Sequence, residues 1–193
     1  GANPIRQDLQ NLNEAGTLYG NIIYNKAPIM MQQLEAVVGQ SEFQSGIREY
    51  LGAFAYGNAT WLDLIGILER KSDVDLRSWS DVWVNTAGRP HFLLEKTAAS
   101  SRLTQVDPGG TGRVWPQQFS VSVRANGSWL SKSVESGPSA FQVFWPEASA
   151  GLLNADGKGY GLFPVDPELF FAWQSLDDTQ RGSLLVSLFE NLL

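Results

Sequence analysis

The spacing of apolar residues changes at Gly88-Arg89-Pro90, and this change constrains the fold of the 193-residue chain more than any other feature. Before it, apolar side chains recur at the three- and four-residue spacing of amphipathic helices. After it, Gly and Pro interrupt the chain often, and the short runs between them alternate apolar with polar residues. The sequence therefore predicts an α+β protein of several domains, helical at first and antiparallel β afterwards.

Four helices are predicted ahead of the change. The first starts at Pro28, whose missing N–H costs little in a first turn, and it ends before Gly39. The second starts near Ser41, which forms a capping-box pattern with Gln44.

The third and fourth helices have their own start signals. Thr60 with Asp63 predicts the start of the third, and the fourth is expected from Asp75 to about Thr86. The apolar positions expected to face inward from the four helices are Met30, Leu34, Val37 and Val38, then Phe43, Ile47, Tyr50, Leu51 and Phe54, then Trp61, Leu64, Ile65 and Leu68, and finally Leu76, Trp79, Val82 and Trp83.

Beyond Pro90 the chain is expected to form a small antiparallel β-sandwich. Phe119, Val121 and Val123 alternate with polar residues, and Asn126-Gly127 follows as a two-residue hairpin signal. Helical spacing returns from Pro167. The expected domains are residues 1–90, helical; residues 91–165, the β-sandwich; and residues 166–193, the start of an α-helical domain.

Charge and composition exclude several kinds of partner. The formal net charge is -6, and residues 1–90 and 91–193 each carry 7 basic and 10 acidic residues. Neither part has the clustered Lys and Arg that phosphate binding needs, so neither nucleic acid nor an anionic membrane surface is an expected partner. No apolar run is long enough to predict a membrane span, and no signal peptide is predicted. The absence of cysteine excludes disulfides and thiolate chemistry, but it leaves the compartment open between cytoplasmic and exported.

Residues 22–90 also carry a series of short motifs in a fixed order. They are Tyr24-x-Lys26, Met30-x-x-x-Leu34-Glu35-x-x-x-Gly39-x-x-x-Phe43, Tyr50-Leu51, Tyr56-Gly57-Asn58-Ala59 and Trp83-x-x-x-x-Gly88-x-Pro90. In this order they resemble the M1 family of zinc aminopeptidases, the gluzincins related to aminopeptidase N. The resemblance implies that residues 1–90 are the rear, helical part of a catalytic domain. It also implies that a β-sandwich and an α-helical domain follow, and Asn154-Ala-Asp-Gly-Lys-Gly-Tyr160 before the last helices is similar to that order.

The resemblance implies a catalytic role for Tyr24. Peptide hydrolysis passes through a tetrahedral oxyanion, and a phenol that stays protonated at neutral pH can donate a hydrogen bond to it. A helix starting near Pro28 would place its positive end close by. Without the resemblance, Tyr24 is better read as a packed aromatic residue whose hydroxyl binds the backbone, because most buried tyrosines are structural.

The zinc ligands of that family are missing from the chain. The family binds zinc through a His-Glu-x-x-His helix and a more distant glutamate, whereas His91 is the single histidine here. His91 is expected to be a solvated residue at a strand edge. The family's Gly-x-Met-Glu-Asn-type loop for the substrate N-terminus is absent too. We therefore expect no metal site in this chain, and zinc only in the full-length protein.

The resemblance implies a full-length zinc metallopeptidase that releases N-terminal residues from peptide substrates, with this chain inactive on its own. The alternative is a non-catalytic interaction or scaffold module, such as a pseudo-peptidase that has lost its zinc motif. A His-Glu-x-x-His motif upstream of Gly1 would favour the enzyme.

Several other residues are weaker candidates. Tyr19 is a possible second pocket residue, and Lys26 is expected either to pair with a carboxylate or, more in keeping with a helix start, to reach solvent along its stem. The glycines at 109, 110 and 112 are expected to form a turn rather than a phosphate loop. Trp61, Trp79 and Trp83 are expected to pack in the core, whereas Trp115, Trp129 and Trp145 lie near expected strand ends.

Overall fold

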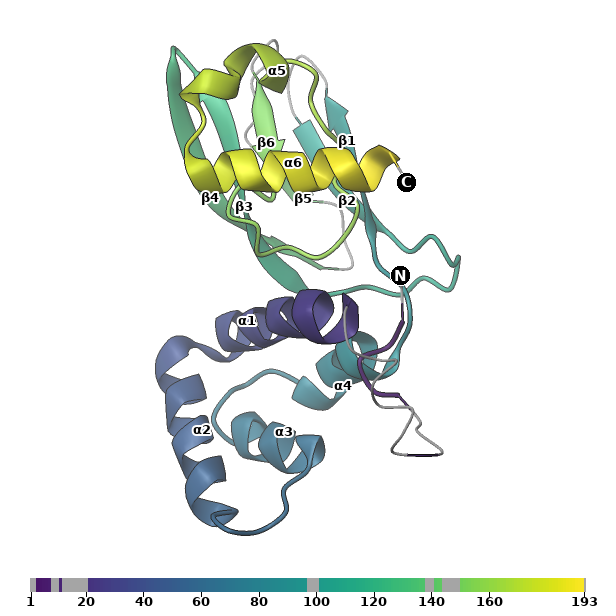
Figure 1. Ribbon diagram of the computed structural model, residues 1–193, viewed down its shortest axis with the longest axis vertical. Helices are drawn as coiled ribbons and strands as arrows, with labels where there is room; N and C mark the ends of the chain where they lie inside the picture. The colour runs from purple at the N-terminus through teal and green to yellow at the C-terminus, as the bar shows by residue number, and fades with distance from the viewer. Residues whose placement is uncertain are drawn as a thin grey trace. The chain divides into compact units, whose positions relative to one another are not determined.

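The computed structural model describes residues 3–7, 11, 21–96, 101–137, 141–143 and 150–192. The chain divides into two compact units, Gly1–Ala87, here called the helical unit, and Gly88–Leu193, here called the sheet unit. Figure 1 shows helices in the first and strands followed by further helices in the second. The predicted α+β fold class is confirmed. The predicted domain borders after residues 90 and 165 stay predictions.

The helical unit follows the start and stop signals of its sequence. Its helices are the π-helix η2 (Asn21–Lys26), α1 (Ala27–Val38), α2 (Gln40–Ala53), α3 (Trp61–Glu69), α4 (Leu76–Ser80) and the π-helix η3 (Asp81–Asn85). Gly39 ends α1 with a φ of 94°, a conformation that glycine adopts without strain. Thr60 and Asp63 form the predicted capping box of α3, and the Asp75 side chain accepts a hydrogen bond from the Ser78 N–H at the start of α4.

Two expectations for the second helix are wrong. Because Gly39 is the single residue between α1 and α2, α2 already begins at Gln40, and Ser41 lies inside it without capping. The expected apolar row does not face inward throughout, since Leu51 is 64% exposed. The close contact between α2 and α3 is made by Gly46 rather than by the apolar row. A Cβ added there would lie 2.4 Å from Leu68 Cδ2, so α2 and α3 approach each other at this glycine.

The core of the helical unit contains residues from α1, α3, α4 and η3. The indole rings of Trp79 and Trp83 stack with their centroids 5.5 Å apart, and both side chains are buried as predicted. Among the described residues of this unit, the other fully buried large side chains are Gln33, Leu34, Ile65, Leu68 and Leu76.

The sheet unit contains two antiparallel three-stranded sheets among the described residues. Its strands are β1 (His91–Lys96), β2 (Ser101–Val106), β3 (Gln117–Ala125), β4 (Ser128–Ser136), β5 (Phe141–Val143) and β6 (Gly151–Leu153), ordered β1-β2-β5 and β4-β3-β6. Asn126-Gly127 joins β3 to β4 with Ala125 opposite Ser128, so the predicted hairpin is confirmed.

One apolar cluster draws on both sheets. Phe92, Phe119 and Phe163 form its centre, with ring centroids 4.5 to 5.2 Å apart. The cluster also holds Leu103, Val121, Val123, Val143 and Leu153. The alternating residues predicted for β3 are therefore buried, while the β-sandwich itself stays a prediction.

The last helices pack on the sheet that contains β6. They are α5 (Leu169–Ala172), the 3₁₀-helix η4 (Trp173–Ser175) and α6 (Asp178–Leu192), and α6 runs across the strands in Figure 1. A second buried cluster joins Leu152 of β6 to Leu169, Leu176 and Leu184. The opposite side of α6 is apolar and exposed, with Leu185, Val186, Phe189 and Leu192. None of the described helices is long and apolar enough to cross a membrane.

Candidate functional site

Tyr24 lies in the middle of the π-helical turn η2, and its side chain is 68% exposed. α1 begins at Ala27, next to the predicted start at Pro28, and the turn runs directly into it, so helical backbone rather than a loop precedes its first turn. Pro28 accounts for the local geometry. It has no N–H for the carbonyl of Tyr24 four residues earlier, and its ring would clash with that carbonyl in a regular α-helix. The wider π-helical turn avoids this contact, and such turns are frequent at functional sites.

Lys26 faces the interior of the helical unit. Its side chain is only 5% exposed, and its ammonium group Nζ donates hydrogen bonds to the carbonyl oxygens of Asn3 and Thr86, each at 3.2 Å. The expectation that Lys26 reaches solvent at a helix start is therefore wrong. The reason is the upstream turn η2, which places residue 26 within a continuous helical segment rather than at its exposed beginning.

The lysine belongs to a junction of three segments, here called the Lys26 junction. The N–H of Arg6 donates to the carbonyl of Val84 at 2.9 Å, which ties residues 3–7 to η3. The hydroxyl of Thr86 donates to the Asp81 carbonyl at 2.8 Å and closes the end of η3. Lys26 then joins η2 to both of these segments. The junction fixes the backbone of the turn that carries Tyr24.

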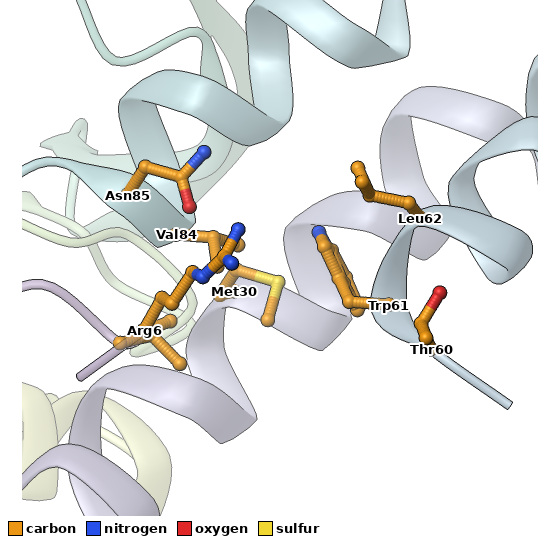
Figure 2. A pocket seen from close by; sticks show the side chains of 8 residues that line it. Arg6, Met30, Thr60, Trp61, Leu62, Val84 and Asn85 are labelled. Carbon is orange, nitrogen blue, oxygen red and sulfur yellow. The ribbon is translucent and has the colours of Figure 1, made fainter. Parts of the chain in front are cut away.

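A pocket of about 440 Å³ in the helical unit borders the Lys26 junction, since Arg6 and Val84 line it. In Figure 2, Met30 and Trp61 face one another across it, and the Trp61 indole N–H donates to the Ser80 hydroxyl at 2.6 Å. Its lining is mostly apolar and consists of Ile5, Arg6, Met30, Thr60, Trp61, Leu62, Val84 and Asn85. Tyr24 is not part of this lining, so the pocket is not built around the candidate catalytic residue.

His91 is not the solvated edge residue that the sequence predicts. It pairs with Val106 of β2 on one side and forms a bridge with Leu162 on the other. The Phe92 N–H donates to the Leu162 carbonyl at 2.9 Å, and the Leu162 N–H donates to the Pro90 carbonyl at 2.8 Å. Residues distant in sequence thus cover the edge of β1, and His91 is half-buried.

The glycines at 109, 110 and 112 lie in a turn, as predicted. The carboxylate of Asp107 accepts hydrogen bonds from the Thr111 hydroxyl and from the N–H groups of Gly109, Thr111 and Arg113. Hydrogen bonds of this kind, above all that from Thr111, lower the pKa of Asp107 to about 2. The acceptor is therefore a carboxylate of the chain, and these N–H groups are not a phosphate cradle.

The remaining aromatic candidates have structural positions or lie outside the described residues. Trp115 is completely buried, and the Trp129 indole N–H donates to the Ser175 hydroxyl at 3.0 Å. Neither presents an open ring platform. Tyr19 and Trp145 lie outside the described residues.

Tyr160 is a structural residue whose role the sequence did not predict. Its hydroxyl donates to the Gly88 carbonyl at 3.1 Å, and its backbone N–H and carbonyl both bind the Gln117 side chain. Burial raises the pKa of Tyr160 to about 12, because the charged phenolate would lose its hydration.

The described residues do not fit a zinc site. Within the described ranges, no three or more His, Cys, Asp or Glu side chains gather closely enough to hold a metal ion. A zinc site in a protein needs three or four such ligands.

Residues 1–83 match the peptidase family M1 domain, and this match includes Asn3, Tyr24 and Lys26. Residues 1–83 are therefore similar to peptidase family M1. Aminopeptidase N of Streptomyces lividans is 38% identical over 85 residues, 44% of this chain and 10% of that protein. The Tricorn protease-interacting factor F2 of Thermoplasma acidophilum is 26% identical over 202 residues, 98% of this chain and 24% of that protein.

A third relative is also much longer than the segment it shares with this chain. The alanine/arginine aminopeptidase of Saccharomyces cerevisiae is 28% identical over 113 residues, which cover 58% of this chain and 13% of that protein. The chain thus spans between 10% and 24% of the length of these three relatives.

Proposed function

We propose that this chain is part of an M1-like zinc metallopeptidase that hydrolyses N-terminal residues from peptides, and that Tyr24 donates a hydrogen bond to the oxyanion of the transition state. The match of residues 1–83 to the M1 domain supports the class of enzyme, as do relatives named as aminopeptidases. The proposed role of Tyr24 is supported by the surroundings of its side chain.

The exposure of Tyr24 is the observation that carries this role. A structural tyrosine is buried and donates to a backbone carbonyl, as Tyr160 does to Gly88. Tyr24 is 68% exposed, and its hydroxyl makes no hydrogen bond within the described part of the chain. The O–H is therefore free to donate to a substrate oxygen that becomes negatively charged during hydrolysis.

The metal of the proposed enzyme is bound by other parts of the full-length protein. We propose that the zinc ligands lie upstream of this chain, in keeping with the M1 resemblance of residues 1–83. The contribution of this chain is the oxyanion donor and the helical scaffold that holds it. The chain alone is expected to be inactive on aminoacyl substrates.

Replacing Tyr24 by Phe in the full-length protein tests the proposal. The ring stays and one donor is lost, so kcat is expected to fall by roughly 10²- to 10³-fold, while KM changes little. Metal content and Tm should stay at the wild-type values. Tyr56→Phe is the matched control, because Tyr56 is also an exposed tyrosine of the helical unit. A Tyr24→Phe enzyme with near-normal kcat would return Tyr24 to a structural role.

A further inference from the structure

The buried ammonium group two residues after Tyr24 has no assigned role. We propose that Lys26 is a positioning residue, which aims the Tyr24 hydroxyl by fastening the inner side of the turn η2 to the backbone at Asn3 and Thr86. This inference rests on the proposed function of Tyr24 and extends it to the residue that orients the donor.

The two side chains lie on opposite sides of one turn. Residues two apart in a helical turn do not face each other. Accordingly Tyr24 is 68% exposed, whereas Lys26 is 5% exposed. Fixing the inner side of such a turn also fixes the direction in which its outer side points.

Pro28 removes one regular helical hydrogen bond at the point where η2 meets α1. Pro28 cannot donate to the Tyr24 carbonyl, so the regular bond that would hold this carbonyl in an α-helix is missing. A rotation of the turn would move the phenol away from the oxyanion position. Catalytic groups lose much of their effect when they are misplaced by about 1 Å.

A lysine suits this position because an ammonium group carries three N–H donors and no acceptor. Two of its acceptors come from separate segments, Asn3 in the lead-in and Thr86 after η3. The Arg6 N–H joins these two segments to each other through Val84. Lys26 thus links η2 to two segments that are already joined to each other without the lysine.

A double-mutant cycle in the full-length protein separates positioning from general stability. Lys26→Met keeps the length and apolar stem of the side chain but removes its donors. We expect kcat to fall roughly 10- to 100-fold with little change in KM. In a Tyr24→Phe background the same change should lower kcat by less than about threefold, because residues that act through one another are not additive.

Lys71→Met is the matched control. Lys71 is a lysine of the same unit that pairs with Glu49 at 2.8 Å, away from the Lys26 junction. Its replacement is expected to leave kcat unchanged in both backgrounds. If Lys26→Met does not fold, Lys26→Gln, which keeps one donor group, provides the same cycle.

Amide hydrogen exchange on the 193-residue chain gives a readout that does not depend on activity. In Lys26→Met, protection of the amides of residues 21–26 should fall about tenfold or more, while residues 61–69 of α3 keep theirs. Unchanged protection in η2 would overturn the inference.

The activity data distinguish the two proposals. Full additivity of Lys26→Met and Tyr24→Phe, or a Lys26→Met enzyme of normal kcat, would refute the positioning role and leave the role of Tyr24 intact. A Tyr24→Phe enzyme of normal kcat would refute both.

Discussion

Tyr24 and Tyr160 place the same phenol in opposite surroundings, and their chemistry differs accordingly. Tyr24 is exposed in a turn, whereas Tyr160 is enclosed and donates to Gly88. The first is suited to meet a substrate, and the second is suited to hold the start of the sheet unit in place.

Alkaline pH provides a test of the Tyr160 environment. Its ordinary pKa of 10.0 is raised to about 12 in the folded chain, so its contribution to stability is fully present below pH 10 and is lost as the pH rises through 12. The free energy of unfolding should therefore fall between these two pH values. In Tyr160→Phe this part of the decline should be absent.

Urea unfolding of both proteins at a series of pH values measures the effect. At neutral pH, Tyr160→Phe should cost about 1 kcal/mol, since the Gly88 carbonyl loses its partner. Two curves that run parallel from pH 7 to pH 12 would contradict the environment described for Tyr160.

The exposure of single residues was the least predictable property of the chain. Lys26, Met30 and Leu34 are four residues apart and share one helix face, and this spacing is a signal for the burial of Lys26. Its partner Thr86, however, lies sixty residues away in sequence. Only the folded chain brings that carbonyl to the lysine, so spacing alone could not reveal the contact.

At the scale of elements, the capping box of α3 should contribute measurable stability. Thr60→Ala removes the acceptor of the Asp63 N–H, and it should lower the free energy of unfolding by about 1 kcal/mol. Ser41→Ala should change it by less than about 0.5 kcal/mol, because Ser41 is exposed and caps no helix. Chemical denaturation followed by circular dichroism compares the two. Equal losses would show that the Thr60 cap contributes nothing of its own.

Ser41 and Thr60 show how far a local sequence pattern can predict the start of a helix. Both carry a capping-box signature, and only Thr60 forms one. Thr60 follows a loop and is free to adopt an extended backbone, whereas Ser41 comes three residues after the end of α1 and already lies within α2. The signature describes a helix start correctly only when the preceding chain leaves room for one.

The two sides of α6 should respond very differently to truncation. Leu184 is completely buried in the cluster with Leu152 and Leu169, and Leu184→Ala should cost about 2 to 5 kcal/mol. The neighbouring Leu185 is 55% exposed, and Leu185→Ala should cost less than about 1 kcal/mol. Thermal unfolding of the two variants measures this difference. Similar Tm values would mean that α6 does not pack on the sheet as described.

For the molecule as a whole, the change of spacing at Gly88-Arg89-Pro90 predicted the order of helices and strands. It could not predict that residues 169–184 pack against β6, because an amphipathic helix has the same sequence pattern whichever surface it covers. The candidate site was predictable only as far as Tyr24. Its anchor, its exposure and the π-helical turn depend on contacts between distant segments.

Metal analysis of the purified chain tests whether the zinc ligands of the proposed enzyme lie outside this chain. We expect less than about 0.1 zinc per chain after dialysis against a mild chelator, since the chain has one histidine and no cysteine. About one tightly bound zinc per chain would refute this expectation. It would also require ligands within this chain.

The stacked indoles of Trp79 and Trp83 give the helical unit an optical label of its own. Two aromatic chromophores 5.5 Å apart couple their electronic transitions, and the coupling disappears when the rings separate. Trp115, Trp129 and Trp173 of the sheet unit form no stacked indole pair among the described residues, and the paired rings of that unit are Phe92, Phe119 and Phe163, which absorb at shorter wavelengths than indole. Loss of the paired indole signal in circular dichroism on heating will therefore report when the helical unit, and with it the support of Tyr24, comes apart.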